Sequence, residues 1–394
     1  MDQPQVAGDA RASTRFHGLD ALRAAMMLLG VLLHVACSFQ LGEADAGWGY
    51  RDPDTSLWAT LLVLGIHAFR MPVFFVLAGF FAALVAQRRG LAGAWRERLA
   101  RIALPLLLGV VLLVPLVEAA FSYAGARALG GGRATLMLHP AWPSGGLAHL
   151  WFLWYLLLIG SGALALAAVA RRLPSTWLER GARASRFVFG GSHPGVRLAL
   201  LVGATWATLC TMKHAAIETP SGWWPNWSAL LLYALCFGAG WLLHGAPEAW
   251  TELRARWKRR LATAALVLPL HLLLALVSFD GLRRGEDRTW AFAGAHLCTA
   301  LVIWQVALGG MGAAEQLLRS ERPLVRWLVD ASYWVYLVHL PLAVHVVADL
   351  RGWDAPALAK LAACVAIVLA LSLASHAAAK AVLRSAARGA PRLD

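Results

Sequence analysis

The chain has 394 residues, of which 59% are hydrophobic and only 15% are charged, and its net charge is +14 at neutral pH. Soluble domains average about 45–50% apolar and about 25% charged residues, so this composition lacks the polar surface of a soluble enzyme, a disordered protein or a disulfide scaffold. The basic balance favours either nucleic acid or an anionic membrane surface as the contact, and the positions of the charges decide between them.

Apolar stretches recur along the chain at the length that a membrane-spanning helix needs, about 20 residues. We therefore predict an all-α polytopic bundle of about ten spanning helices. In chain order the predicted spans are 19–41, 57–87, 101–123, 147–170, 197–213, 226–244, 261–279, 289–311, 324–350 and 355–384. Pro72 lies inside the second span and predicts a kink there, because proline cannot continue the helical hydrogen-bond ladder. The loops are short, which indicates one transmembrane domain, 19–384, between tails 1–18 and 385–394.

The orientation follows from the Lys and Arg residues of the short loops. With an even number of spans, most of the 36 Lys and Arg residues fall on the side that holds both chain ends. We therefore predict that both termini are cytoplasmic. The excess charge is then explained by topology and contact with the lipid bilayer, so we expect no nucleic-acid partner.

The five cysteines stand apart from one another in apolar stretches, and no CxxC is present. This spacing predicts neither a disulfide nor a zinc site. The polar N-terminal segment does not have the pattern of a signal peptide.

Ionisable side chains inside a span are costly to insert, which makes each of them a functional candidate. In the first span, Arg23 lies at the cytoplasmic end, and His34 follows eleven residues later. At 1.5 Å per residue, the imidazole lies about 16 Å deeper, near the bilayer middle. Asp20 lies one turn before Arg23 and can pair with it or cap the helix. Arg23 is then either an interfacial anchor or a cation below the histidine.

The second span carries His67 and Arg70, whose spacing of three places them on one helical face. Arg70 falls well inside the membrane next to the Pro72 break, where a guanidinium needs a carboxylate, a phosphate or freed backbone carbonyls. It binds either a protein carboxylate, such as Glu118 of the third span, or an anionic group of a substrate.

Three later segments add candidates. Arg98 and Arg101 are one turn apart at the cytoplasmic start of the third span, where they serve as anchors or bind a phosphate-rich cytosolic donor. His149 lies at the start of the fourth span among tryptophans typical of an outer aromatic belt, and it can alternatively face an outer vestibule. His339 of the ninth span is about as deep as His34, which favours one cavity shared by two midplane imidazoles.

Three functions fit these groups. A neutral histidine near the midplane suits general-base catalysis, with a phosphorylated donor held by the cations beneath it. The cluster of His34, His67, Arg70 and His339 equally suits a secondary transporter that couples protons to an organic anion, although the paired halves common in transporters are not evident. A nonenzymatic scaffold for glycan export would be expected to carry a long loop or a soluble domain, and none is predicted.

Five segments in order resemble the acyltransferase 3 family of integral membrane acyltransferases. GLDALRAAMMLLGVLLH resembles the first-helix motif, in which ten residues separate a basic residue from a histidine, here Arg23 and His34. FRMPVFFVLAGFF resembles the FFxxSG segment, with Ala78 where many members have serine. WRERLARIALP resembles the RxxR motif through Arg98 and Arg101. HLWFLWYLL and SYWVYLVHLPL resemble two later landmarks, and the resemblance extends over residues 16–345.

The resemblance implies an enzyme of the bacterial inner membrane that takes acyl-CoA from the cytosol and acylates an acceptor at or beyond the outer face. By the same resemblance, His34 is the catalytic base on the acceptor hydroxyl, and Arg98 and Arg101 hold the donor phosphates with Arg23 nearby. No metal or permanently bound cofactor is implied.

Within the family, the chain looks closest to members that transfer succinyl groups to osmoregulated periplasmic glucans. Arg70 would suit an acyl chain that ends in a carboxylate, such as succinyl. His149 and His339 complete the expected substrate-binding residues. A homo-oligomer is compatible with the sequence.

Overall fold

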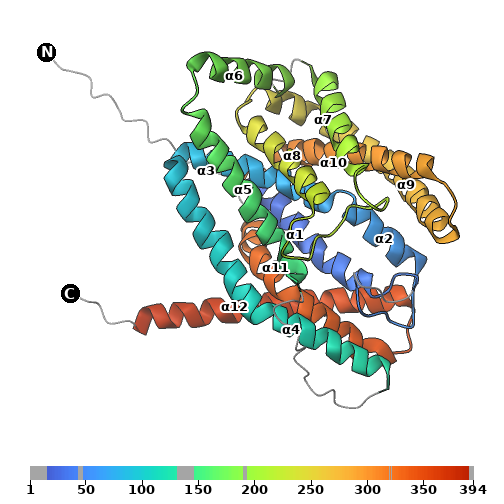
Figure 1. Cartoon of the computed structure of the whole chain (residues 1–394). Coiled ribbons are helices and arrows are strands. Elements are labelled where there is room, and N and C mark those ends of the chain that lie inside the picture. The colour runs from blue at the N-terminus through green and yellow to red at the C-terminus, as the bar shows by residue number, and fades with distance from the viewer. Residues whose placement is uncertain are drawn as a thin grey trace.

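The computed structural model describes residues 16–42, 48–130, 146–189, 193–318, 320 and 322–389, and these residues form a helical bundle (Figure 1). The helices are α1 His17–Cys37, α2 Leu57–His67, α3 Arg70–Arg98, α4 Leu104–Ala128, α5 Trp151–Ala170, α6 Ser175–Phe189, α7 Pro194–Leu209, α8 Trp227–His244, α9 Ala249–Arg284, α10 Thr289–Leu317, α11 Pro323–Asp349 and α12 Ala357–Gly389. Shorter elements are the π-helical η1, Leu99–Ala103, and the 3₁₀ turns η2, Ala148–Leu150, and η3, Leu350–Gly352. The predicted all-α polytopic class is confirmed.

Eight helical stretches of the described residues are long and apolar enough to cross a membrane. The predicted spans 57–87 and 101–123 both fall within one of them, Leu57–Ala128. Gly90 interrupts that stretch with φ 69° and ψ 174°, a conformation open essentially only to glycine. The predicted span 197–213 corresponds to α7, which has only 16 residues. The number of crossings and the cytoplasmic placement of the termini stay predictions.

The predicted tails fall mostly outside the described residues. Within those residues, α1 already begins at His17 and α12 continues to Gly389. A segment that we expected to be a loop on the cytoplasmic side instead contains the helix α6, Ser175–Phe189.

The kink expected at Pro72 occurs four residues before it, between α2 and α3. Pro72 has no N–H for the carbonyl of Ala68, and its ring clashes with that carbonyl, so the ladder breaks at this turn. His67 therefore ends one helix and Arg70 begins the next. The expectation that these two residues share one helical face is wrong.

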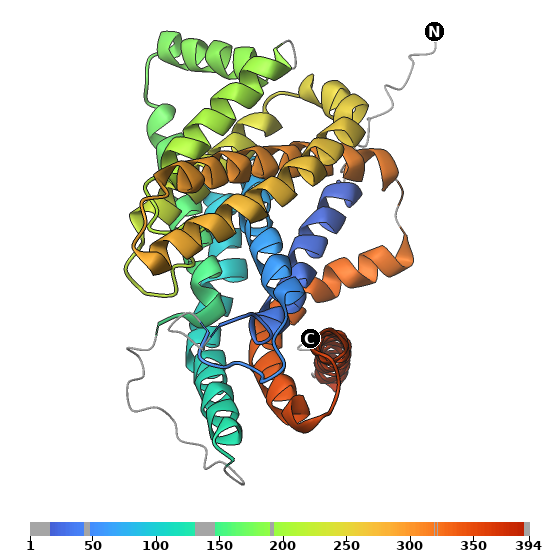
Figure 2. The ribbon, with the colours of Figure 1, turned by 90° about the vertical axis from the view of Figure 1, so that its right-hand side faces the viewer.

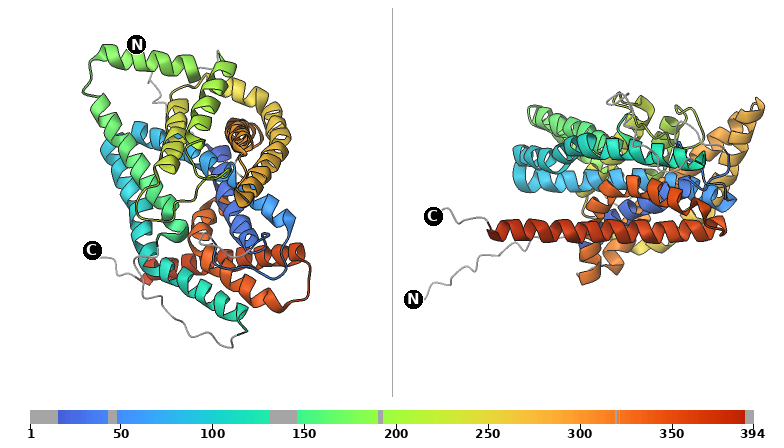
Figure 3. Two further views of the ribbon diagram at one scale, coloured as in Figure 1. Left: turned by 45° about the vertical axis from the view of Figure 1, so that its right-hand side comes forward. Right: turned by 90° about the horizontal axis from the view of Figure 1, so that it is seen from below.

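α1 occupies a central position and packs against α2, α3, α10, α11 and α12. Around it, α9 and α10 run side by side (Figure 2), while α12 lies against α11 and extends beyond the bundle (Figure 3). Met26 and Met27 of α1 belong to an apolar cluster with α3, α5, α8 and α10. Leu33 and Val35 belong to a second cluster with α2, α11 and α12. His34 thus lies near the boundary between two apolar cores.

Candidate functional site

Three histidines from three elements lie together in the interior. His34 projects from α1, His339 from α11 and His149 from η2, directly before α5. The ring centroids of His34 and His339 are 5.2 Å apart, and those of His339 and His149 are 5.4 Å apart. The expected meeting of His34 and His339 is confirmed. His149, which we placed at an outer belt or vestibule, is buried beside them.

The three imidazoles line one small cavity together with Arg70 of α3. Neither Arg98 nor Arg101 lines it. Its other walls are made by Met26, Met27, Met71, Phe74, Trp151, Phe152 and Tyr336. The arrangement brings a small number of polar groups together in a small, largely apolar cavity.

Backbone carbonyls fix the tautomers of two of the rings. Nδ1 of His339 donates to the carbonyls of Tyr336, at 2.7 Å, and Val335, at 3.2 Å, so its proton is on Nδ1. Nε2 of His149 donates to the carbonyl of Leu337 at 3.0 Å. The remaining nitrogens, Nε2 of His339 and Nδ1 of His149, are buried without a hydrogen-bond partner in the described part of the chain, and so is Nδ1 of His34.

Arg70 places its guanidinium against α1. A Cβ added to Gly30 would overlap Nη1 of Arg70 and would lie 3.9 Å from Nε2 of His339. Gly30 precedes His34 by one turn, so both face the cavity side of α1. Among the described residues, no carboxylate lies within ion-pair distance of Arg70, and Glu118 is not its partner. The alternative of a structural pair with Glu118 is therefore excluded.

Arg98 and Arg101 differ in their surroundings, contrary to the expectation that both lie at the surface. Arg98 is only 9% exposed, donates to the carbonyl of Leu156 at 2.8 Å and lies over the ring of Phe237. Arg101 is 75% exposed and pairs with Glu97 at 3.3 Å. Arg98 is the last residue of α3, whereas Arg101 lies within the π-helical segment η1, whose wider turn differs from that of an α-helix.

Two other candidates lie outside the cavity. Arg23 pairs with Asp20 at 2.8 Å, one of the contacts expected for it, and lies 5.0 Å from the ring centroid of Phe81. Nε2 of His67 is 2.9 Å from the hydroxyl oxygen of Thr219.

Sequence reasoning missed a residue that packs against His34. Trp48, in the loop between α1 and α2, places its ring 5.6 Å from that of His34. A tryptophan in a loop gives no periodic signal. The one available indication was Lys360, a cation inside an apolar span, whose contacts with the same loop are described below.

Known proteins with a similar sequence place the chain in a family. A family model described as an acyltransferase domain matches residues 16–376. Glucans biosynthesis protein C of Salmonella paratyphi B is 25% identical over 343 residues, covering 84% of this chain and 83% of the relative. The protein of the same name from Salmonella schwarzengrund is 24% identical over 361 residues, covering 86% and 87%. No solved structure matches the chain. Because the family match includes every helix that builds the cavity, the chain belongs to the acyltransferase 3 family and is a membrane acyltransferase.

Proposed function

We propose that this protein is an O-acyltransferase of the bacterial inner membrane, which moves an acyl group from cytosolic acyl-CoA to a hydroxyl of a periplasmic glycan. The names of the relatives support a glucan as the acceptor. The observation that carries the proposal is the shared cavity of His34 and Arg70, an imidazole beside a cation that has no carboxylate partner among the described residues.

His34 acts as the general base. Its neutral ring takes the proton of the acceptor hydroxyl while that oxygen attacks the thioester carbonyl. The new C–O bond forms, the C–S bond breaks, and the proton passes to the departing thiolate. A positioned base of this kind contributes about 10²–10⁴-fold to the rate.

His339 orients His34. Nε2 of His339 carries a lone pair, because its Nδ1 proton is committed to helix carbonyls, and both this atom and Nδ1 of His34 are buried without a partner in the described structure. A hydrogen bond from Nδ1 of His34 to Nε2 of His339, tightening when substrates bind, leaves the lone pair of His34 on Nε2. His149 also packs on His339 and limits its movement.

Arg70 binds the substrate group that supplies its missing counter-charge. A guanidinium binds a carboxylate through two parallel hydrogen bonds, which suits an acyl chain with a terminal carboxylate, such as succinyl. Arg101 is exposed and pairs with Glu97, and Arg23 is partly exposed and pairs with Asp20, so donor phosphates would compete with these carboxylates for the two guanidinium groups. Arg98 is buried against α5 and contacts a donor only after the donor has entered the bundle.

The test compares His34→Ala with the wild type in membrane vesicles that contain the full chain, succinyl-CoA and purified glucan. Mass spectrometry of the glucan detects the transferred group. His345→Ala is the control, because His345 of α11 is also a histidine of a long apolar helix but stacks on Tyr123 outside the cavity. We expect transfer by the wild type and the control and none by His34→Ala. Full transfer by His34→Ala would exclude His34 as the general base. Uptake of an organic anion by the vesicles without acyl-CoA would instead indicate a transporter.

A further inference from the structure

Residues 48–56, which lead from the loop after α1 into α2, lie against one side of the site. Trp48 packs between His34 and Phe121 of α4, with ring centroids 5.6 Å and 5.2 Å apart. Its indole N–H donates to the hydroxyl oxygen of Ser38 at 2.9 Å. Trp48 is itself only 8% exposed. The loop therefore places a large apolar ring against the histidine of the cavity.

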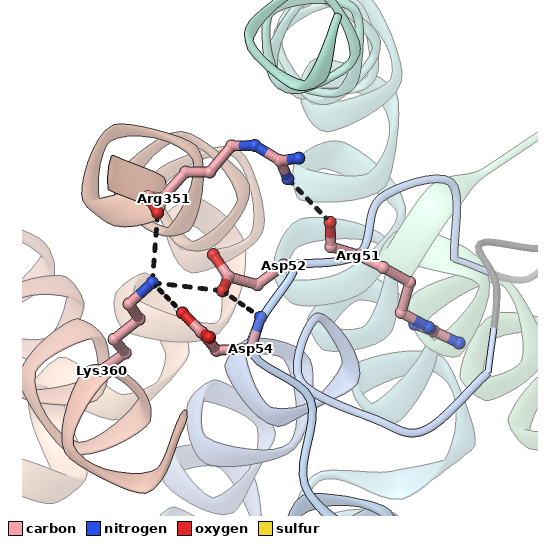
Figure 4. Close-up of polar contacts among 5 residues, drawn as sticks. All are labelled: Arg51, Asp52, Asp54, Arg351 and Lys360. Carbon is pink, nitrogen blue, oxygen red and sulfur yellow. Dashed lines mark hydrogen bonds and ion pairs between the residues drawn. The ribbon is translucent and has the colours of Figure 1, made fainter. Parts of the chain in front are cut away.

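A buried lysine of the last helix anchors this loop (Figure 4). Nζ of Lys360 in α12 donates to Asp54 at 2.6 Å, to Asp52 at 3.4 Å and to the carbonyl of Arg351 at 3.1 Å. An ammonium group has three N–H donors, and all three are used. The guanidinium of Arg351 also donates to the carbonyl of Arg51 at 3.2 Å. The loop is thus attached at two points to the α11–α12 end of the bundle.

The burial of this ion pair indicates its role. The side chain of Lys360 is 1% exposed and that of Asp52 is 0% exposed, whereas Asp54 is half-exposed. Burial raises the pKa of Asp52, and the nearby Lys360 ammonium opposes that rise. A buried ion pair adds little net stability, but the loss of one partner leaves an uncompensated charge that must reach water. The ion pair therefore contributes more to the position of the loop than to the stability of the protein.

We propose that Lys360, through Asp52 and Asp54, is a positioning residue of the transferase: it holds Trp48 against His34 and keeps water from the base. This inference rests on the proposed function of His34. When the loop is released, water replaces the acceptor hydroxyl. The water oxygen then attacks the thioester carbonyl, giving the free acid and CoA, so hydrolysis competes with transfer.

The ratio of hydrolysis to transfer separates this role from a structural one. The purified full-length protein is given succinyl-CoA with and without glucan, and released CoA and acylated glucan are measured. For Lys360→Met we expect transfer to fall about 10–100-fold, because small displacements of reacting groups have effects of this size. The ratio of hydrolysis to transfer should rise about tenfold. Arg288→Met is the control, because it breaks an exposed ion pair with Glu286 on another loop. It should change neither quantity.

Two further variants keep the test decisive if Lys360→Met folds poorly. Lys360→Arg keeps the charge, and the double variant Asp52→Asn with Lys360→Met removes both buried charges. Lys360→Arg should restore most of the wild-type ratio. The double variant leaves no buried charge unpaired and should fold, but it lacks the anchor, so its ratio should stay raised. Variants that lose transfer and hydrolysis in equal proportion, with no change in their ratio, would overturn the proposal.

A chemical probe tests the loop independently of catalysis. Cys37 is half-buried three residues after His34, and its carbonyl accepts a hydrogen bond from Arg51 of the loop. We expect Lys360→Met to speed maleimide labelling of Cys37 about tenfold, as opening of a local segment exposes it. Unchanged labelling contradicts the loop proposal. If the wild type neither transfers nor hydrolyses the donor, while labelling rises as expected, the proposed function has failed and the anchoring role of Lys360 stands.

Discussion

Interior arginines at two places in this molecule, the buried Arg197 with Arg260 and the half-buried Arg70, have opposite surroundings. Arg197 and Arg260 share the carboxylate of Glu252, each taking one of its oxygens, with 2.7 Å between Arg260 and Glu252. This group joins α7 to α9. Arg70 lies on a cavity, and no carboxylate of the described chain reaches it. A buried cation requires a counter-charge. The first group contains its own, so it is structural, whereas the second lacks one, which suggests that a ligand supplies it.

The largest expected effect comes from breaking the self-contained group. Glu252→Gln leaves two buried guanidinium groups without a carboxylate, and loss of a buried partner costs about 3–5 kcal/mol. We expect a clear fall in the thermal unfolding midpoint of the purified protein. The control is Asp280→Asn, which removes an exposed partner of Arg284 and should cost about 0.2–1 kcal/mol. Equal thermal unfolding midpoints for Glu252→Gln and Asp280→Asn would show that Glu252 is not a structural partner of the two arginines.

Arg70→Met tests the other side of the comparison. Because Arg70 has no protein carboxylate among the described residues, its removal should leave the unfolding midpoint unchanged or raise it. The kcat/KM for succinyl-CoA should fall by about 10–100-fold, since hydrogen bonds to charged groups contribute about 1.5–3 kcal/mol. The kcat/KM for acetyl-CoA, which has no terminal carboxylate, should change much less.

Arg70→Lys sharpens that test, because lysine keeps the charge but lacks the planar fork. Its activity with succinyl-CoA should be intermediate. If Arg70→Met instead unfolds as easily as Glu252→Gln, Arg70 is a structural residue and the comparison fails.

The contrast between the two groups was only partly predictable from sequence. Hydropathy was sufficient for the helical class, and the depth of His34 and His339 in their spans was sufficient for their meeting. The partners of Arg70 could not be predicted, because they depend on which helices pack together. The burial of Arg98 depends on the π-helical turn after it and on α5. Trp48 lies in a loop, where no periodicity indicates which side chain it covers.

A smaller effect is expected at Gly30, where the backbone of α1 makes room for Arg70. In Gly30→Ala the added methyl group displaces the guanidinium, and a shift of this kind should lower kcat/KM for succinyl-CoA about tenfold. The matched control is Gly203→Ala in α7, where an added Cβ meets no atom within 4 Å. Equal activity of the two variants would show that the position of Arg70 against α1 is unimportant.

The smallest effect on stability is expected at Arg101, which is exposed and pairs only with Glu97 in the described structure. Arg101→Gln should cost about 0–1 kcal/mol, as for other surface ion pairs. If Arg101 binds donor phosphates, the KM for acyl-CoA rises in the variant. The dependence of KM on salt also weakens, because exposed charges are screened over about 8 Å at physiological ionic strength. Arg98→Gln should instead act mainly on stability, because it loses the bond to Leu156 in the interior. An unchanged KM and salt dependence in Arg101→Gln would make Arg101 a membrane anchor, and a donor site would then have to be sought among the cations deeper in the bundle.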